Sequence, residues 1–374
     1  MHPFSRLTCV ALLAASCTGR EAGHEAGPAV TPLDSVVLAE PDSLETFLAL
    51  RTQALTPGGE LLLETGTQIL QFEASGALAR VLGRPGHGPG EFVRISSIGL
   101  LPGDSLVAAV DARRARIVVF GLSDGALRRE VSLAVPFYPD QQWVVRGDSV
   151  IMPGKLRREP FTTWITSTDS VRSWGTAPAI YDRSMQAYSQ GGEPSLAPHG
   201  GGWVALFPAD PALYELDASG QPSRSTVIPS RRRVGVPSDV ADQVATIAAA
   251  DSFRFAASLV LAVRQLSTGT YLLVHVDADP EKVRSIHDPG SGGHGISYRN
   301  VRYWVSLVSA DLSRACVDGR VPLDVDNILS PFFRADTLYF VARRLAAGDR
   351  LRSVLYSFRV DDVDCDWLPT APHN

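Results

Sequence analysis

The residues best suited to binding chemistry stand in one glycine-rich stretch, VLGRPGHGPGEF at residues 81–92. It offers an imidazole at His87 and a carboxylate at Glu91, among four glycines and two prolines. Such a loop can cradle a phosphate when it follows a strand, opens a helix and ends in Lys-Ser or Lys-Thr. Here no lysine follows, and residues 91–101 read as extended structure. The pattern therefore favours a structural corner, with glycines at positive φ, prolines in the turns, Glu91 capping backbone N–H groups and Phe92 packed between sheets.

Metal binding has one candidate segment, SIHDPGSGGHGIS at residues 285–297, which contains His287, Asp288 and His294. Two imidazoles and a carboxylate can ligate zinc. The six residues between the two histidines, rich in glycine, do not make a tight ligand spacing. We expect a solvated loop there, and neither a metal ion nor another cofactor in the protein.

Aromatic side chains supply a candidate ligand surface. The six tryptophans are scattered along the chain, a spacing more typical of sheet packing than of a stacking platform. The irregular segment at residues 174–194 differs, because it brings Trp174, Tyr181 and Tyr188 into one long loop. Long loops on rigid scaffolds often carry binding, so these three residues are the predicted ligand surface.

The elements that would position these residues repeat along the chain. Six strand-like apolar runs begin at residues 59, 104, 148, 201, 269 and 336, about 45 residues apart at first and with insertions later. A strand, a polar glycine turn and a second strand follow most clearly at residues 68–78, 116–127 and 212–222, and more weakly at 162–171, 302–312 and 353–363. Several strands in a unit of this length predict the blades of a β-propeller, and six units predict six blades. A two-sheet sandwich is the alternative, but it needs neither six copies nor this length.

A helical pattern occurs only at residues 237–263, between the fourth and fifth units. Ser238 can cap a helix there, and an alanine-rich run with high helix propensity follows. The predicted fold is an all-β, six-bladed β-propeller with a short helical insertion, and the chain returns to β structure before Val263.

The N-terminus predicts export. A short cationic start precedes the apolar run LTCVALLAA at residues 7–15, which suits a secretory signal and is too short to span a bilayer. LAASC at residues 13–17 resembles the bacterial lipobox, which implies lipidation of Cys17; an ordinary signal with incidental cysteines is the alternative. Residues 18–32 are small and polar and read as a flexible tether. We therefore expect a signal peptide at 1–17, a tether at 18–32, a propeller at 33–374, and a membrane-anchored lipoprotein facing the periplasm or the cell surface.

Two further cysteines, Cys316 and Cys365, belong to the folded part. In an oxidising compartment they can pair, but the sequence does not show whether they come within bonding range, so both states stay open. The charge balance is mildly acidic, with 35 basic against 40 acidic residues, which argues against nucleic acid as a partner.

The chain resembles the bacterial six-bladed β-propeller lipoproteins related to the NHL-repeat family. The residues that carry the resemblance are LGRPGHGPGEF at 82–92 and DARRARIVVF at 111–120. In that family such a segment joins one blade to the next, which implies an interblade loop formed by Gly83, Gly86, Gly88, Gly90, Glu91 and Phe92. The resemblance extends over residues 33–368 but is strong only in the first two units, since no later unit repeats the segment.

The function expected from these features is binding. Serine, histidine and aspartate are all present, but no catalytic set among them rises above background. We expect a monomeric, lipid-anchored, non-catalytic module that binds a protein, peptide or glycan. The alternative is an extracytoplasmic hydrolase, lactonase or lyase acting at the central channel. Lactonases use six-bladed propellers too, but their calcium sites draw on asparagines, of which this chain has three.

Overall fold

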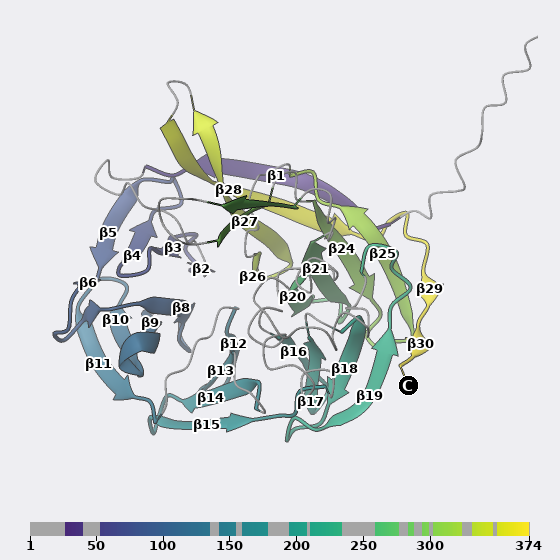
Figure 1. The fold of residues 1–374 in the computed structure, drawn as a ribbon, viewed down its shortest axis with the longest axis horizontal. Coiled ribbons are helices and arrows are strands. Elements are labelled where there is room, and N and C mark those ends of the chain that lie inside the picture. The colour runs from purple at the N-terminus through teal and green to yellow at the C-terminus, as the bar shows by residue number, and fades with distance from the viewer. Residues whose placement is uncertain are drawn as a thin grey trace, which may run out of the picture.

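A computed structural model of the chain describes residues 27–39, 53–134, 142–154, 159–178, 194–207, 210–233, 259–276, 283–287, 294–298, 302–323, 331–346 and 350–373. Within them, six antiparallel sheets stand around a central axis like the blades of a propeller (Figure 1). The predicted all-β, six-bladed β-propeller is therefore confirmed.

Blades 1 to 3 are each built from four consecutive strands, ordered from the axis to the rim. Blade 1 contains β2 (Gln53–Leu55), β3 (Leu61–Glu64), β4 (Ile69–Phe72) and β5 (Leu78–Leu82). Blade 2 contains β8 (Ile95–Leu100), β9 (Leu106–Asp111), the 3-10 turn η1 (Ala112–Arg114), β10 (Arg116–Gly121) and β11 (Leu127–Ser132). Blade 3 contains β12 (Val144–Arg146), β13 (Ser149–Pro153), β14 (Phe161–Ile165) and β15 (Ser170–Trp174).

Blades 4 and 5 each gain a fifth, short strand from the C-terminal tail. Blade 4 contains β16 (Ser195–His199), β17 (Gly202–Leu206), β18 (Ala212–Leu216), β19 (Pro222–Val227) and, from the tail, β30 (Ala371–Pro372). Blade 5 contains β20 (Leu259–Gln265), β21 (Tyr271–Val276), β24 (Tyr303–Val308), β25 (Arg314–Arg320) and, from the tail, β29 (Leu368–Pro369). A separate hairpin of β22 (Val283–His287) and β23 (His294–Tyr298) lies in sequence between β21 and β24.

Blade 6 closes the ring, because it joins the two ends of the chain. Its three inner strands are β26 (Phe332–Arg334), β27 (Thr337–Ala346) and β28 (Arg350–Asp361), and its outermost strand is β1 (Ala29–Val37). β1 runs antiparallel to β28, from Ala29 opposite Asp361 to Val37 opposite Val354. The backbone hydrogen bonds of this pairing hold the first and last units together (Figure 1).

This closure corrects two predictions. The boundary expected between tether and propeller at residue 33 falls inside β1, which begins at Ala29. The weak hairpin expected at residues 353–363 is not formed, since the outer partner of β28 comes from the N-terminus. Seven of the nine residues of β1 are exposed. Because backbone hydrogen bonds hold this outer strand in place, its sequence needs few apolar residues and resembles that of a tether.

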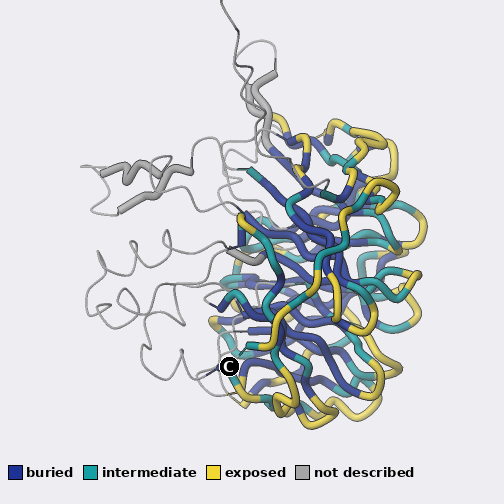
Figure 2. Tube along the Cα trace, turned by 90° about the vertical axis from the view of Figure 1, so that its right-hand side faces the viewer, coloured by how far each residue is buried: buried dark blue, intermediate teal, exposed yellow. Residues whose placement is uncertain are grey.

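The core lies between neighbouring blades. The six apolar runs of the sequence form the second strand of each blade, namely β3, β9, β13, β17, β21 and β27. Every residue of β3, β17 and β21 is buried, because each blade packs on both faces and its central strands need apolar side chains on both sides. Figure 2 shows these buried strands inside the disc, while exposed residues gather in the tight turns along its right-hand edge.

The predicted helical insertion lies mostly outside the described residues, which omit 234–258. The predicted return to β structure before Val263 agrees with the start of β20 at Leu259. In the part of the chain that the structure describes, no helix has the length and apolarity needed to cross a membrane.

Candidate functional site: the channel pocket

A cavity of about 300 Å³ lies where the innermost strands of the blades meet. Residues of β2, β8, β12, β20 and β26, or of the turns beside them, line it, so five of the six blades contribute. Its rim includes Pro57, Asp104 and Ala335, which lie in turns between the first and second strands of their blades. The tight turns gather on one face of the ring (Figure 2). Because residues of such turns line the cavity, hereafter the channel pocket, it opens on that face.

Apolar side chains form much of the wall of the channel pocket. Trp143 and Phe333 are 7% and 5% exposed, and Leu100 of β8 lies beside them in the lining. The Trp143 indole N–H donates to Ser97 Oγ at 2.6 Å, so the ring is fixed in place. A Cβ atom at Gly99 would stand 2.3 Å from Trp143 Cε3, so only glycine at that position lets the indole lie against β8.

Polar groups from different blades converge on the same cavity. Gln53 of blade 1 is only 5% exposed, and its Oε1 has no hydrogen-bond partner among the described residues. Gln142 Nε2 donates to the Phe333 carbonyl at 3.1 Å. Arg264 of blade 5 is half-buried, and its buried Nε makes no hydrogen bond within the part of the chain that the structure describes. Burial lowers the pKa of Arg264, because desolvation disfavours its charged form.

This arrangement suits ligand binding. Small-ligand sites combine apolar walls with a few fixed polar groups, and the lining of the channel pocket contains both kinds of side chain. Among the described residues that line the pocket there is no serine, cysteine or histidine, and the one carboxylate is that of Asp104 on the rim. The lining therefore provides recognition groups but no nucleophile paired with a base.

The histidine loop is described only in its backbone. His287 ends β22 and stands opposite His294, which begins β23, so the two residues are cross-strand partners in the hairpin. Asp288 lies outside the described residues. Among described side chains, no group of three or more His, Cys, Asp or Glu residues is placed to hold a metal ion.

The glycine-rich stretch lies between blade 1 and blade 2. It contains a short parallel pair, β6 (Arg84–Pro85) with β7 (Glu91–Phe92). Phe92 is fully buried, and its ring centroid lies 6.0 Å from that of Phe120. The glycines at positive φ are Gly83, Gly86 and Gly90, whereas Gly88 is not among them.

The carboxylate of Glu91 forms its hydrogen bonds within the loop. Glu91 Oε2 accepts the Gly88 N–H at 2.7 Å, and Glu91 Oε1 accepts the Arg84 Nε–H at 2.8 Å. The Gly88 hydrogen bond, and then Arg84, hold the pKa of Glu91 below its usual value. His87 is exposed. The carboxylate of Glu91 therefore caps the backbone of its own turn.

Arg116 fastens the loop to blade 2. This residue is 5% exposed and forms an ion pair with Glu130 at 2.5 Å. Its guanidinium also donates to the carbonyl oxygens of Gly88 and Glu91. Asp111, which is fully buried, accepts the N–H groups of residues 93 and 94. The two segments that carry the family resemblance are therefore in direct contact.

Of the predicted aromatic surface, Trp174 is described and Tyr181 and Tyr188 are not. Trp174 ends β15 and packs between blades 3 and 4, with its ring centroid 5.0 Å from that of Phe161 and 5.8 Å from that of Trp203. Its indole N–H donates to Thr163 Oγ1 at 2.7 Å. The described contacts of Trp174 are those of a residue that packs between two blades.

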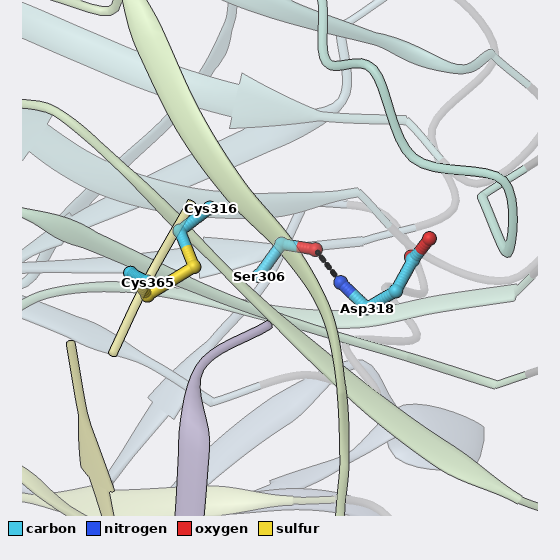
Figure 3. Close-up of a disulfide and its surroundings, with 4 residues drawn as sticks. All are labelled: Ser306, Cys316, Asp318 and Cys365. Carbon is cyan, nitrogen blue, oxygen red and sulfur yellow. Dashed lines mark hydrogen bonds between the residues drawn. A yellow bond between two sulfur atoms is a disulfide. The ribbon is translucent and has the colours of Figure 1, made fainter. Parts of the chain in front are cut away.

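Cys316 and Cys365 are joined by a disulfide (Figure 3), with Cα atoms 5.7 Å apart. Cys316 is buried in β25, while Cys365 begins the tail that continues as β29 on blade 5 and β30 on blade 4. Thr370 Oγ1 also donates to the Leu312 carbonyl at 2.8 Å. The bond therefore anchors a tail that covers the outer edges of two blades. Cys17 lies outside the described residues.

Comparison with known proteins agrees with this architecture. Residues 61–144, from β3 to the start of β12, match the family model DUF5128, described as a 6-bladed beta-propeller. A DUF4221-family protein from Bacteroides vulgatus has a similar structure, with a TM-score of 0.63 and 11% identity over 90% of this chain and 99% of that one. A candidate exported protein from Bacteroides fragilis has a TM-score of 0.55 and 14% identity over 89% and 95% of the two chains. No curated protein matches the sequence. At these identities the likeness shows the fold alone.

Sequence reasoning missed the polar residues of the channel pocket. Gln53 and Gln142 stand in or beside very short inner strands, which give no periodic signal. Arg264 does have a signal in the sequence, because it is the one charged residue in the apolar strand LVLAVRQ. A charge inside such a strand is the signal that could have pointed to the channel.

Proposed function

We propose that the protein is an extracytoplasmic, lipid-anchored β-propeller that binds a protein, peptide or glycan at the channel pocket and leaves it chemically unchanged. The observation that carries the proposal is the lining of that pocket, in which apolar side chains meet two glutamines and two arginines. A protein or glycan would reach it with one projecting side chain or sugar, since the cavity holds about 300 Å³. The proposal includes a monomeric protein with no nucleic-acid partner.

Three features support an extracytoplasmic location. The N-terminal sequence has the order of a lipoprotein signal, with the apolar run followed by LAASC. The bond between Cys316 and Cys365 suits an oxidising compartment. The structurally similar protein from Bacteroides fragilis carries the name of a candidate exported protein.

Lipid anchoring predicts a clear result for the Cys17→Ala variant. Because the thiol of Cys17 would carry the lipid, its removal should move the protein from the membrane fraction to the soluble fraction. Fractionation of cells that express wild type or variant measures this, with Cys9→Ala as the matched control that should stay at the membrane. A Cys17→Ala variant that fractionates like the wild type contradicts the anchor.

Binding without turnover is tested with a panel of short peptides and oligosaccharides. We expect members of the panel to raise the melting temperature of the purified propeller, since a ligand that binds only the folded state stabilises it. Each bound probe should be recovered with its mass unchanged after long incubation. A probe that is cleaved, opened or eliminated instead supports the alternative, a hydrolase, lactonase or lyase.

A further inference from the structure

We propose that the channel pocket recognises a carboxylate group of its ligand, through the guanidinium of Arg264. This rests on the proposed function, because it names the chemistry of a ligand bound at that same pocket.

The charge of Arg264 has no ion-pair partner among the described residues, although the carboxylate of Asp336 acts on it electrostatically. Within the described part of the chain its guanidinium makes neither a hydrogen bond nor an ion pair, and its Nε is buried. Burial lowers the pKa of Arg264, yet a guanidinium stays protonated in proteins. A partly desolvated charge without a partner is unfavourable, and an incoming anion would relieve that cost.

The carboxylates nearby do not fill this role. Asp336, the acidic residue whose charge acts on Arg264, accepts the Ser267 N–H at 2.8 Å and the Ser267 hydroxyl. Asp104 lies on the exposed rim of the pocket. Arg334 adds a second positive charge to the lining, although its guanidinium already donates to the carbonyl of residue 57. Two arginines against one exposed aspartate favour an anionic ligand.

A carboxylate fits this site better than a phosphate. One guanidinium binds both oxygens of a carboxylate with two parallel hydrogen bonds and balances its single charge, whereas a phosphate dianion would keep a second negative charge to be balanced. The buried Gln53 Oε1 needs a donor, such as an amide N–H or a hydroxyl next to the carboxylate. Trp143 and Phe333 can cover an apolar portion of the same group.

Two sources of such a carboxylate exist, the free end of a peptide and an acidic sugar. We therefore choose two pairs of probes that differ in charge alone or nearly so. N-acetyl-leucine is compared with N-acetyl-leucinamide, and glucuronate with glucose. Titration calorimetry on the purified propeller should show binding of at least one carboxylate, about tenfold or more tighter than its neutral match.

Three variants separate recognition from folding. Arg264→Gln should weaken binding of the carboxylate about tenfold or more, and Arg264→Lys should fall between it and the wild type, because an ammonium keeps the charge but not the fork. Arg113→Gln, which removes an exposed arginine at η1, should bind like the wild type. The melting temperature of Arg264→Gln without ligand should equal or exceed that of the wild type, since no partner is lost.

The outcomes decide between the claims. If the carboxylate of only one pair binds more tightly than its neutral match, the inference is supported. That pair then identifies the source of the carboxylate, a peptide end or an acidic sugar. Equal binding of a carboxylate and its neutral match, or full binding by Arg264→Gln, overturns it. If neither carboxylate binds while neutral peptides or sugars of the panel do, the carboxylate inference fails and the proposed function stands. If nothing in the panel binds, both fail.

Discussion

Gly83→Ala should lower the melting temperature of the propeller by roughly 5–10 °C, because the loop between blades 1 and 2 has no room for a side chain there. Gly83 has a φ of +71°, and a Cβ atom would stand 2.4 Å from Cε2 of Phe92. Phe92 is fully buried against Phe120, so its ring cannot move without disturbing the packing of both blades. Backbone strain and overpacking together should cost about 3 kcal/mol or more of the free energy of unfolding.

Gly103→Ala is the matched control. Gly103 has a similar φ of +86°, but no atom lies within 4 Å of its added Cβ. The Gly103→Ala variant should lose about 1 kcal/mol of the free energy of unfolding, from the strain of a left-handed backbone alone. The difference between the two variants therefore isolates the contact with Phe92. His87→Ala should leave stability unchanged, since that side chain is exposed. A Gly83→Ala or Gly90→Val protein of wild-type stability that no longer binds a ligand would contradict the structural role of the loop.

The double variant Cys316→Ala/Cys365→Ala should lose about 2–4 kcal/mol of unfolding free energy. The disulfide links residues 49 positions apart and so restricts the unfolded chain. It also holds the tail that forms β29 and β30, so amide hydrogen exchange should speed up at Leu368 and Ala371. Urea unfolding measures the first effect.

Reductant supplies the control for this prediction. Wild type in dithiothreitol should resemble the double variant, and the double variant should not respond to dithiothreitol at all. Thiol titration in denaturant without reductant gives an independent reading. Two reactive thiols other than Cys17 would show that the bridge is not formed in the protein.

The six-bladed fold could be predicted because the second strand of each blade is buried on both faces. Runs such as LLLE in β3 and YLLVHV in β21 are buried throughout and mostly apolar, and their spacing reveals the repeat. The innermost strands of blades 1 and 3 could not be predicted from the sequence. β2 and β12 have three residues each, too few for a period.

The ring closure could not be predicted for a different reason. β1 is an outer strand with seven exposed residues of nine, and it is held to β28 by backbone hydrogen bonds, which depend little on the type of side chain. Its pairing joins residues more than 300 positions apart, from Ala29 to Asp361. Neither composition nor local pattern carries that information.

The candidate site was only partly within reach of the sequence. The corner segment could be predicted, since glycine and proline impose local backbone geometry. The channel pocket could not, because Gln53, Gln142 and Arg264 come from three blades and meet only in the closed ring. Trp174 shows the converse, as a residue in an irregular segment whose indole turns back into the interblade packing.

Blocking the channel pocket tests the central claim most directly. Val145 lines the pocket and is 44% exposed, while Val81 is 42% exposed on β5 and does not line it. In a propeller that lacks Cys17, Val145→Cys or Val81→Cys adds one free thiol beside the bonded pair of cysteines, and a bulky maleimide can label it. The account predicts that labelled Val145→Cys loses binding of every panel probe that the wild type binds, whereas labelled Val81→Cys keeps it. Equal binding by the two labelled proteins would contradict a binding function at the channel pocket.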